Sequence, residues 1–353
     1  MIELRAPTRS SLPHRLVVLA LGGVLCLAGC GGGGGSGGGG PYPLDDALRL
    51  NDLQAKGTHN SYRYLDAPPL LPDWDYSHAP LATQLESQGV RQLELDLHWD
   101  ADEGLYRVYH LDMVDMLSRC DRFVDCLKDV RGWSEAHRLH QPIFIMLEPK
   151  GGFDLDVLDA RHAELDAEIR SVFSEDELIT PDMVRGTHAS VREAIQTEGW
   201  PTLGQTRGRV LFFYNCSRPV CVAYANHGEG LAGRVVFADA NADDPWAGVR
   251  VMNTPGPDVK AAVEAGFIVR TWPEDLTKII AGEPSNLQAG LDSGAQLIST
   301  DFPVSREDIP FVTHGVDYVM NIPGGTPSRC DPITAPADCR STDIENPDHL
   351  ATP

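Results

Sequence analysis

Two histidines and four side chains with oxygen donors follow short apolar runs in the first half of the chain. They are His59 and Asn60, Glu94 and Asp96, His110, and Glu148. Glu94 and Asp96 are two residues apart, so in a β-strand both side chains point to the same face. Oxygen-only ligation selects a hard cation, and calcium tolerates a mixed set of carboxylates, an amide carbonyl and water better than magnesium does. The set Asn60, Glu94, Asp96 and Glu148 therefore predicts a metal site that favours Ca²⁺.

The two histidines suit the cleavage of a phosphodiester that carries a neighbouring hydroxyl group. One of His59 and His110 can remove the hydroxyl proton, and the other can protonate the departing oxygen. Lys150 and Arg270 could add fixed positive charge near the phosphoryl oxygens. Taken singly, each of these residues is more often an ordinary core histidine, a surface carboxylate or a satisfied hydrogen-bonding group. It is their combination that indicates a catalytic site.

The elements that would bring these residues together follow a repeating pattern of strand and helix. Eight runs are expected to be strands, at residues 53–56, 92–97, 105–109, 142–147, 210–214, 235–238, 267–271 and 296–299. Helix-like stretches separate most of them, including residues 80–87, 123–140, 154–171 and 258–265. The pattern predicts an α/β fold, a (β/α)₈ TIM barrel in a single domain, with the site at the carboxyl ends of its strands. Residues 98–104 are too few for a crossover helix, so we expect an irregular barrel there.

The N-terminus has the features of an export signal. Three arginines precede an apolar run that ends at Leu27-Ala28-Gly29-Cys30, which resembles the lipobox of bacterial lipoproteins. We therefore expect a signal peptide over residues 1–29, a lipidated Cys30 with a glycine-rich tether over residues 30–40, and a folded domain over residues 41–353. The alternative is ordinary cleavage near the same place, which would leave Cys30 as a free thiol. The expected location is the bacterial cell envelope or surface, with the protein anchored in the membrane.

Charge and cysteine content narrow the class of protein further. The formal net charge is −22, and removal of three arginines and one glutamate with the signal peptide leaves −24. Nucleic acid is therefore not an expected partner. Six later cysteines lie in close pairs, which in an exported chain indicate disulfides between neighbours rather than a zinc site. The pairs are Cys120 with Cys126, Cys216 with Cys221, and Cys330 with Cys339, the last in a stapled C-terminal tail.

Several motifs together resemble a known family. GTHNSY (57–62), LELD (93–96), VYH (108–110) and LEPK (147–150) are similar to the X-domain of calcium-dependent phosphatidylinositol-specific phospholipases C. VRTW (269–272), STDFP (299–303) and RCDPITAP (329–336) are similar to its actinomycete-type branch. The resemblance implies that His59 is the catalytic base and His110 the catalytic acid, and that Asn60, Glu94, Asp96 and Glu148 bind Ca²⁺. A metal-bound carboxylate such as Glu94 could share the role of the base. It also implies a monomer that acts on phosphatidylinositol, or a related inositol phosphodiester, at a membrane surface, releasing diacylglycerol and a (cyclic) inositol phosphate.

Two other functions compete with this interpretation. A glycerophosphodiester phosphodiesterase shares the barrel and most of the site, but is expected to carry His-Arg-Gly after the first strand, where this chain has His59-Asn60. A surface lipoprotein that only binds inositol headgroups would keep the barrel as a scaffold. Loss of either histidine would indicate that second function, and both histidines are present.

Overall fold

Part of the central sheet consists of continuous apolar runs, as expected where both faces of a parallel sheet are covered. In β5 (Val210–Tyr214), for example, all five residues are buried. The computed structural model describes residues 40–151 and 157–350. Together with β5, seven other parallel strands form the wall of the barrel. They are β1 (Leu53–Thr58), β2 (Val90–Asp100), β4 (Ile143–Pro149), β6 (Val236–Ala238), β7 (Val249–Val251), β8 (Ile268–Thr271) and β9 (Leu297–Thr300).

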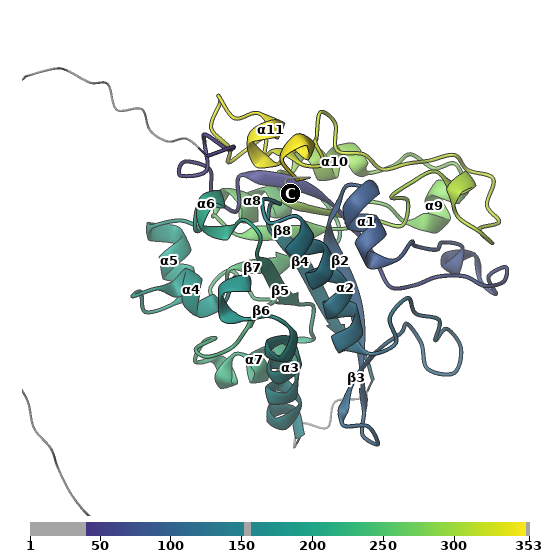
Figure 1. Cartoon of the computed structure of the whole chain (residues 1–353), viewed down its shortest axis with the longest axis horizontal. Helices are drawn as coiled ribbons and strands as arrows, with labels where there is room; N and C mark the ends of the chain where they lie inside the picture. The colour runs from purple at the N-terminus through teal and green to yellow at the C-terminus, as the bar shows by residue number, and fades with distance from the viewer. Residues whose placement is uncertain (1–39, 152–156, 351–353) are drawn as a thin grey trace, which may run out of the picture. The chain divides into compact units, whose positions relative to one another are not determined.

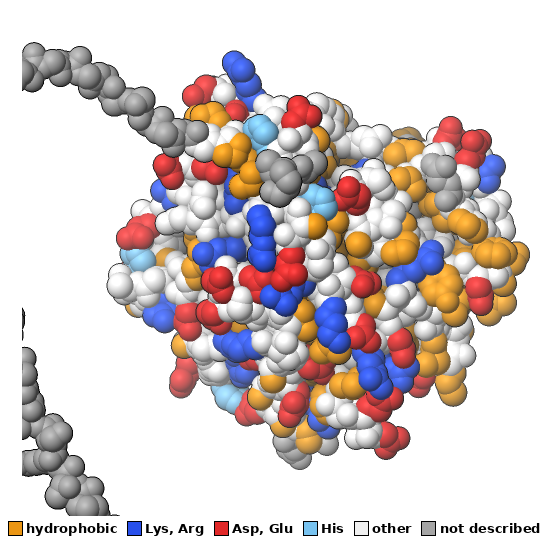
Figure 2. Space-filling view, in the orientation of Figure 1, with side chains coloured by type: hydrophobic (Ala, Val, Ile, Leu, Met, Phe, Trp, Pro, Cys, Tyr) orange, Lys and Arg blue, Asp and Glu red, His pale blue; other side chains and the backbone are white. Residues whose placement is uncertain are grey.

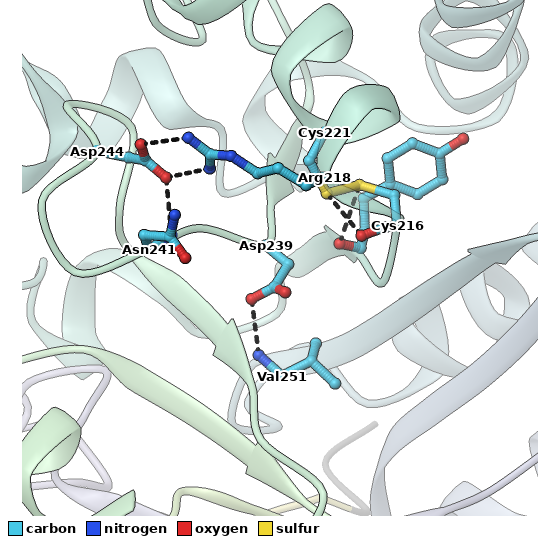
Figure 3. Close-up of a disulfide and its surroundings, with 8 residues drawn as sticks. Cys216, Arg218, Cys221, Asp239, Asn241, Asp244 and Val251 are labelled. Atoms are coloured by element: carbon cyan, nitrogen blue, oxygen red, sulfur yellow. Dashed lines mark hydrogen bonds and ion pairs between the residues drawn. A yellow bond between two sulfur atoms is a disulfide. The ribbon is translucent and has the colours of Figure 1, made fainter. Parts of the chain in front are cut away.

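These eight strands pair in the order β6-β5-β4-β2-β1-β9-β8-β7, and every pair along this path is parallel. No strand ladder joins β6 to β7 within the described residues. Instead, the Asp239 carboxylate at the end of β6 accepts a hydrogen bond of 3.0 Å from the Val251 backbone N–H (Figure 3). The sheet is thus a nearly closed barrel, which confirms the predicted fold class.

Helices cover the outside of the sheet (Figure 1). The longer ones are α2 (Phe123–Ala136) and α3 (Leu158–Val172), and α2 buries Phe123, Leu127 and Val130 along one face. The remaining α-helices are α1 (Leu81–Ser87), α4 (Pro181–Arg185), α5 (Val191–Thr197), α6 (Leu203–Thr206), α7 (Arg218–Tyr224), α8 (Pro257–Glu264), α9 (Leu276–Ile280), α10 (Leu287–Asp292), α11 (Ser341–Ile344) and α12 (Pro347–Leu350). None of the described helices is long and apolar enough to cross a membrane.

The wall differs from the prediction at two strands. Residues 105–109 were expected to form a barrel strand, but β3 (Leu105–Val108) pairs antiparallel with the end of β2 as a hairpin, off the barrel path. The short 98–104 connection permits a hairpin and not a parallel crossover. The eighth barrel strand is β7, which the sequence did not reveal because Arg250 interrupts its three residues and leaves no apolar run.

The C-terminal tail covers the end of the barrel where β1 begins. β10 (Arg329–Cys330) pairs antiparallel with Leu53 and Gln54, and Arg91 forms a buried ion pair with Glu345. The three predicted disulfides are confirmed, including Cys330–Cys339 in this tail and Cys216–Cys221 beside α7 (Figure 3). The predicted signal peptide, Cys30 and all but the last residue of the tether lie outside the described residues.

Candidate active site and metal centre

The turn after β1 presents the first two site residues above β2. Asn60 has a φ of 46°, a left-handed conformation that asparagine tolerates better than most residues. Ser61 fastens the turn: its N–H donates to the Glu94 carbonyl at 3.0 Å, and its hydroxyl accepts from the Glu94 N–H at 2.7 Å. His59 and Asn60 are thereby held next to the carboxylates of β2.

Three carboxylates form a cluster at the carboxyl ends of β2 and β4. Glu94 and Asp96 are buried, and Asp96 is the register partner of Glu148 on the neighbouring strand. One ligand atom from each of the three residues lies within 4.8 Å of the others. This is the convergence that the spacing of the motifs predicted.

The cluster fits a hard cation. Both Asp96 oxygens are buried; Oδ1 accepts no hydrogen bond from any described residue, and Oδ2 has the Lys150 ammonium 3.0 Å away. Burial raises the pKa of Asp96, Lys150 opposes the rise, and Glu94 and Glu148 add to it. A divalent cation would compensate this charge, and the donors are all oxygens of the kind calcium binds. The Asn60 side-chain oxygen accepts a hydrogen bond of 3.3 Å from Tyr62 and keeps a second lone pair that could serve as a ligand.

The two basic residues expected near the phosphate contact this cluster. Arg270 lies in β8, is 2% exposed, and its Nη2 lies 2.7 Å from Glu94 Oε2. Lys150 Nζ lies 3.0 Å from Asp96 Oδ2 and donates to Glu148 Oε1. In this structure both cations are therefore paired with carboxylates.

Groups from three other strands, or from the residues just after them, contact His59. Its Nδ1 lies 2.8 Å from Asp301 Oδ1, just after β9, and its Nε2 lies 3.7 Å from Glu94 Oε1. Trp272, after β8, stacks on the imidazole with ring centroids 4.4 Å apart. Burial lowers the pKa of His59, but the Asp301 and Glu94 carboxylates outweigh that effect and raise it to about 9. With Nδ1 bound to Asp301, Nε2 is the nitrogen that can exchange a proton with a substrate.

His110 has a similar arrangement on the loop after β3. Its Nδ1 lies 3.0 Å from Asp115 Oδ2, and Arg63 holds the same oxygen from 2.7 Å. Trp74 meets the imidazole edge-on, with ring centroids 5.9 Å apart. The Nε2 atom is again left for proton transfer.

One cavity of about 250 Å³ is lined by both histidines together with Trp74, Trp272 and Asp301. Two imidazoles, each oriented by a carboxylate and facing the same space, can act as a base and an acid on one bound molecule. The cluster of carboxylates adjoins this space through the contact between His59 and Glu94.

Four residues that complete the site were not assigned by sequence reasoning. Asp301 lies in the STDFP motif at the end of a predicted strand, and Trp272 in VRTW, so position could have indicated both. Asp115 comes from an irregular loop, and Asn215, whose amide donates to Glu148 Oε2 at 2.8 Å, follows a strand whose outlet carried no recognised motif. No sequence pattern points to those two.

The sequence of the chain matches a known family, and its fold is similar to those of known proteins. The sequence model of the family described as phosphoinositide phospholipase C, Ca²⁺-dependent, matches residues 48–109 and 106–332. No curated protein sequence matches significantly. Among solved structures, a Ca²⁺-dependent phosphatidylinositol-specific phospholipase C from Streptomyces antibioticus is similar, with a TM-score of 0.57, 22% identity, and 76% of this chain and 98% of that chain covered.

A second similar structure is the calcium-dependent phosphoinositol-specific phospholipase C of a Gram-negative Pseudomonas species. Its TM-score is 0.58 at 21% identity, and the match covers 82% of this chain and 97% of that chain. At sequence identities this low, the similarity to the two structures supports the assignment of the fold alone. The family match rests on the sequence over most of the chain.

Proposed function

The chain belongs to the family of Ca²⁺-dependent phosphoinositide phospholipases C, which are phosphoric diester hydrolases, and from this premise we propose its reaction. The protein cleaves the glycerol–phosphate bond of phosphatidylinositol and releases diacylglycerol and a (cyclic) inositol phosphate. The observation that supports this most directly is the single cavity lined by two carboxylate-held histidines beside three clustered carboxylates.

Glu94, Asp96, Glu148 and Asn60 would hold the calcium ion. When bound, calcium lowers the pKa of a coordinated hydroxyl and neutralises negative charge on the phosphoryl oxygens. The chain itself supplies the orientation of these ligands through the β2–β4 register and the turn at Asn60.

His59 acts as the base and His110 as the acid. Asp301 holds His59 Nδ1, so Nε2 receives the proton of the inositol 2-hydroxyl. Asp115 holds His110 Nδ1, so Nε2 delivers a proton to the departing glycerol oxygen. Arg270 remains a fixed positive charge beside Glu94.

Phosphatidylinositol would reach the site from a bilayer, and the rim of the barrel suits such a surface. Large apolar side chains are exposed on the loop after β1, the loop after β3 and the segment after β9: Leu70, Leu71, Leu111, Met113, Val114, Met116 and Phe311. Hydrophobic side chains gather along the right-hand edge of Figure 2, where Figure 1 draws these loops. Trp74 and His110 from two of the same loops line the cavity. We further propose that export and a lipid anchor at Cys30 keep the protein at the membrane of the cell envelope.

Assays on phosphatidylinositol vesicles and on glycerophosphoinositol, with calcium or with a chelator, test the proposal. We expect calcium-dependent release of diacylglycerol and a cyclic inositol phosphate, detected by phosphorus NMR, and none in chelator. Glu94→Gln should fold and lose turnover, because the amide still accepts a hydrogen bond from the buried Arg270 whereas the metal loses a carboxylate. Full activity in excess chelator contradicts the proposal. Preferential release of glycerol phosphate from glycerophosphoinositol indicates a glycerophosphodiester phosphodiesterase instead.

A further inference from the structure

Lys150 lies among the carboxylates assigned to calcium. Its ammonium is 3.0 Å from Asp96 Oδ2 and donates to Glu148 Oε1. The other Glu148 oxygen, Oε2, accepts the 2.8 Å hydrogen bond from Asn215. Both Glu148 oxygens are therefore engaged, one of them by a positive charge.

A metal ion on the same oxygens would lie very close to this ammonium. Calcium binds oxygen at about 2.3–2.6 Å, so an ion sharing Glu148 Oε1 or Asp96 Oδ2 with Lys150 sits within about 6 Å of Nζ. Two cations that close repel strongly where water is largely excluded. We propose that Lys150 and calcium compete for Asp96 and Glu148, so that the lysine must withdraw before the metal binds and thereby sets the calcium affinity. The inference rests on the calcium-dependent function proposed above.

Arg270 does not share this property. It contacts only one oxygen of the cluster, Glu94 Oε2, and also donates to Asn253. Glu94 Oε1 is left for another partner, and the guanidinium is almost fully buried. Arg270 is a fixed counter-charge, whereas the Lys150 side chain is 23% exposed.

Lys150 has a place to withdraw to. It lines a second cavity, of about 390 Å³, together with the acidic Asp112 and the basic Arg161, whose guanidinium packs on Trp99. This cavity has no lining residue in common with the one that contains His59 and His110. The flexible four-carbon stem of lysine allows such a change by side-chain rotation alone. The ammonium can therefore leave the metal ligands without entering the catalytic cavity.

Calcium binding to the purified protein, measured by isothermal titration calorimetry, tests the competition. Lys150→Met removes the ammonium and keeps most of the stem, and Lys150→Gln keeps a neutral donor for Glu148 in case the first variant folds poorly. We expect both to bind calcium at least tenfold more tightly than the wild type. Lys260→Met is the matched control, because Lys260 is exposed on α8 and pairs only with Glu264. Its calcium affinity should equal that of the wild type.

Thermal unfolding supplies a second readout. Without calcium, loss of Lys150 leaves the carboxylates uncompensated, so the variants should melt below the wild type, and calcium should raise their Tm by more than it raises the wild-type value. Unchanged or weaker calcium binding in both variants overturns the competition. If wild type and variants bind calcium equally, only this inference fails; if none binds calcium, the proposed metal site fails with it.

Discussion

Each histidine of the cavity has one ring nitrogen held by a carboxylate. The two rings differ, however, in the charges that surround them. Asp301, which holds His59, lies at the end of a barrel strand, and Glu94 is a second carboxylate near the ring. Asp115, which holds His110, is itself neutralised by Arg63. His59, the proposed base, therefore has the more negative surroundings, and these favour the imidazolium that it becomes when it takes the proton of the hydroxyl; His110, the proposed acid, has the less negative surroundings.

Leaving-group dependence tests this division of roles. A nitrophenyl inositol phosphate has a leaving group that needs no protonation. We therefore expect His110→Ala to recover most of its turnover on it, while His59→Ala stays slow. On phosphatidylinositol each substitution should lower kcat by about 10² to 10⁴. His227→Ala, an exposed histidine paired with Asp159, serves as the control and should match the wild type. Rescue of both variants, or of His59→Ala alone, contradicts the assignment.

The residues that sequence reasoning found and those it missed differ in where they lie. His59, Glu94, Asp96 and Glu148 follow or end strands of the barrel, and strand ends in this fold converge on one rim, so order along the chain was enough to group them. Asp115 reaches His110 only because of the path of a loop. The path of a loop depends on tertiary contacts, which one sequence does not specify.

At the scale of elements, β1 carries the catalytic turn at one end and a buried charge in its middle. Lys56 is 6% exposed, and its ammonium donates to the Pro303 carbonyl at 3.0 Å, two residues beyond Asp301. Burial alone lowers its pKa to about 8 from 10.5. Lys56 therefore links the strand that ends next to His59 to the segment that contains Asp301, and the burial of its charge destabilises the folded protein.

Lys56→Met should stabilise the protein at neutral pH. Below pH 8 this lysine is charged in both the folded and the unfolded chain, so the folded state bears the full cost of burial, about 3 kcal/mol for the cited shift. Loss of the hydrogen bond to Pro303 lowers the free energy of unfolding of the variant by about 1 kcal/mol. The variant should gain about 2 kcal/mol in free energy of unfolding at pH 7.

The advantage should shrink as pH rises from 8 to 10.5, because the wild-type lysine then loses its proton in the folded state first. Urea unfolding at pH 7 and pH 10 measures both values. Lys128→Met, an exposed residue of α2, should change stability by less than about 0.5 kcal/mol at either pH. A Lys56→Met protein less stable than the wild type at pH 7 would mean that the hydrogen bond outweighs the buried charge.

Element-level prediction succeeded where the hydrophobic pattern was long and failed where it was short or ambiguous. The runs 142–147 and 210–214 are apolar throughout, and their short length and β-branched and aromatic residues favour buried strands over helices. Residues 105–109 have strand character too, but the same character suits a hairpin. β7 is as short as β6, but Arg250 in its middle leaves no apolar run to detect. Eight strands were predicted, and eight form the wall, with one exchanged for another.

At the scale of the molecule, an acidic chain has to approach a membrane whose lipids include anionic ones. A formal charge of −22 gives no electrostatic attraction to such a surface. Attachment must then come from apolar contacts, from a lipid anchor, or from both. Cys30, before the folded domain, is the candidate for the lipid anchor, and the exposed apolar residues of the rim are the candidates for the apolar contact.

The anchor is tested at Cys30. We expect the protein recovered from cells to carry an acylated N-terminal Cys30, seen as the added lipid mass by mass spectrometry. Cys30→Ser should release the protein from the membrane fraction, because the buried acyl chains are lost. A matched Cys26→Ser change, upstream of the expected cleavage site, should leave localisation unaltered. An unmodified N-terminus on the wild-type protein contradicts the anchor and leaves the enzymatic proposal intact.

Membrane contact through the rim is tested at Met113 and Phe311, two exposed apolar residues with strained backbone conformations. They are 87% and 49% exposed, and both have positive φ values, 59° and 67°, which side chains of this kind rarely adopt. Met113→Asn with Phe311→Asn removes the apolar surface with a residue that tolerates this backbone, so the loops should keep their shape.

In protein carrying Cys30→Ser, which removes the anchor, this double variant should bind phosphatidylcholine vesicles at least tenfold more weakly, since each buried apolar side chain contributes about 1.5–3 kcal/mol. Wild-type binding should not weaken in high salt, because it depends on apolar contact rather than on charge. Turnover of the soluble nitrophenyl substrate should be unchanged, which separates docking from catalysis. Unchanged vesicle binding would exclude these two residues from the membrane contact, and a parallel loss on the soluble substrate would mean that the loops shape the cavity instead.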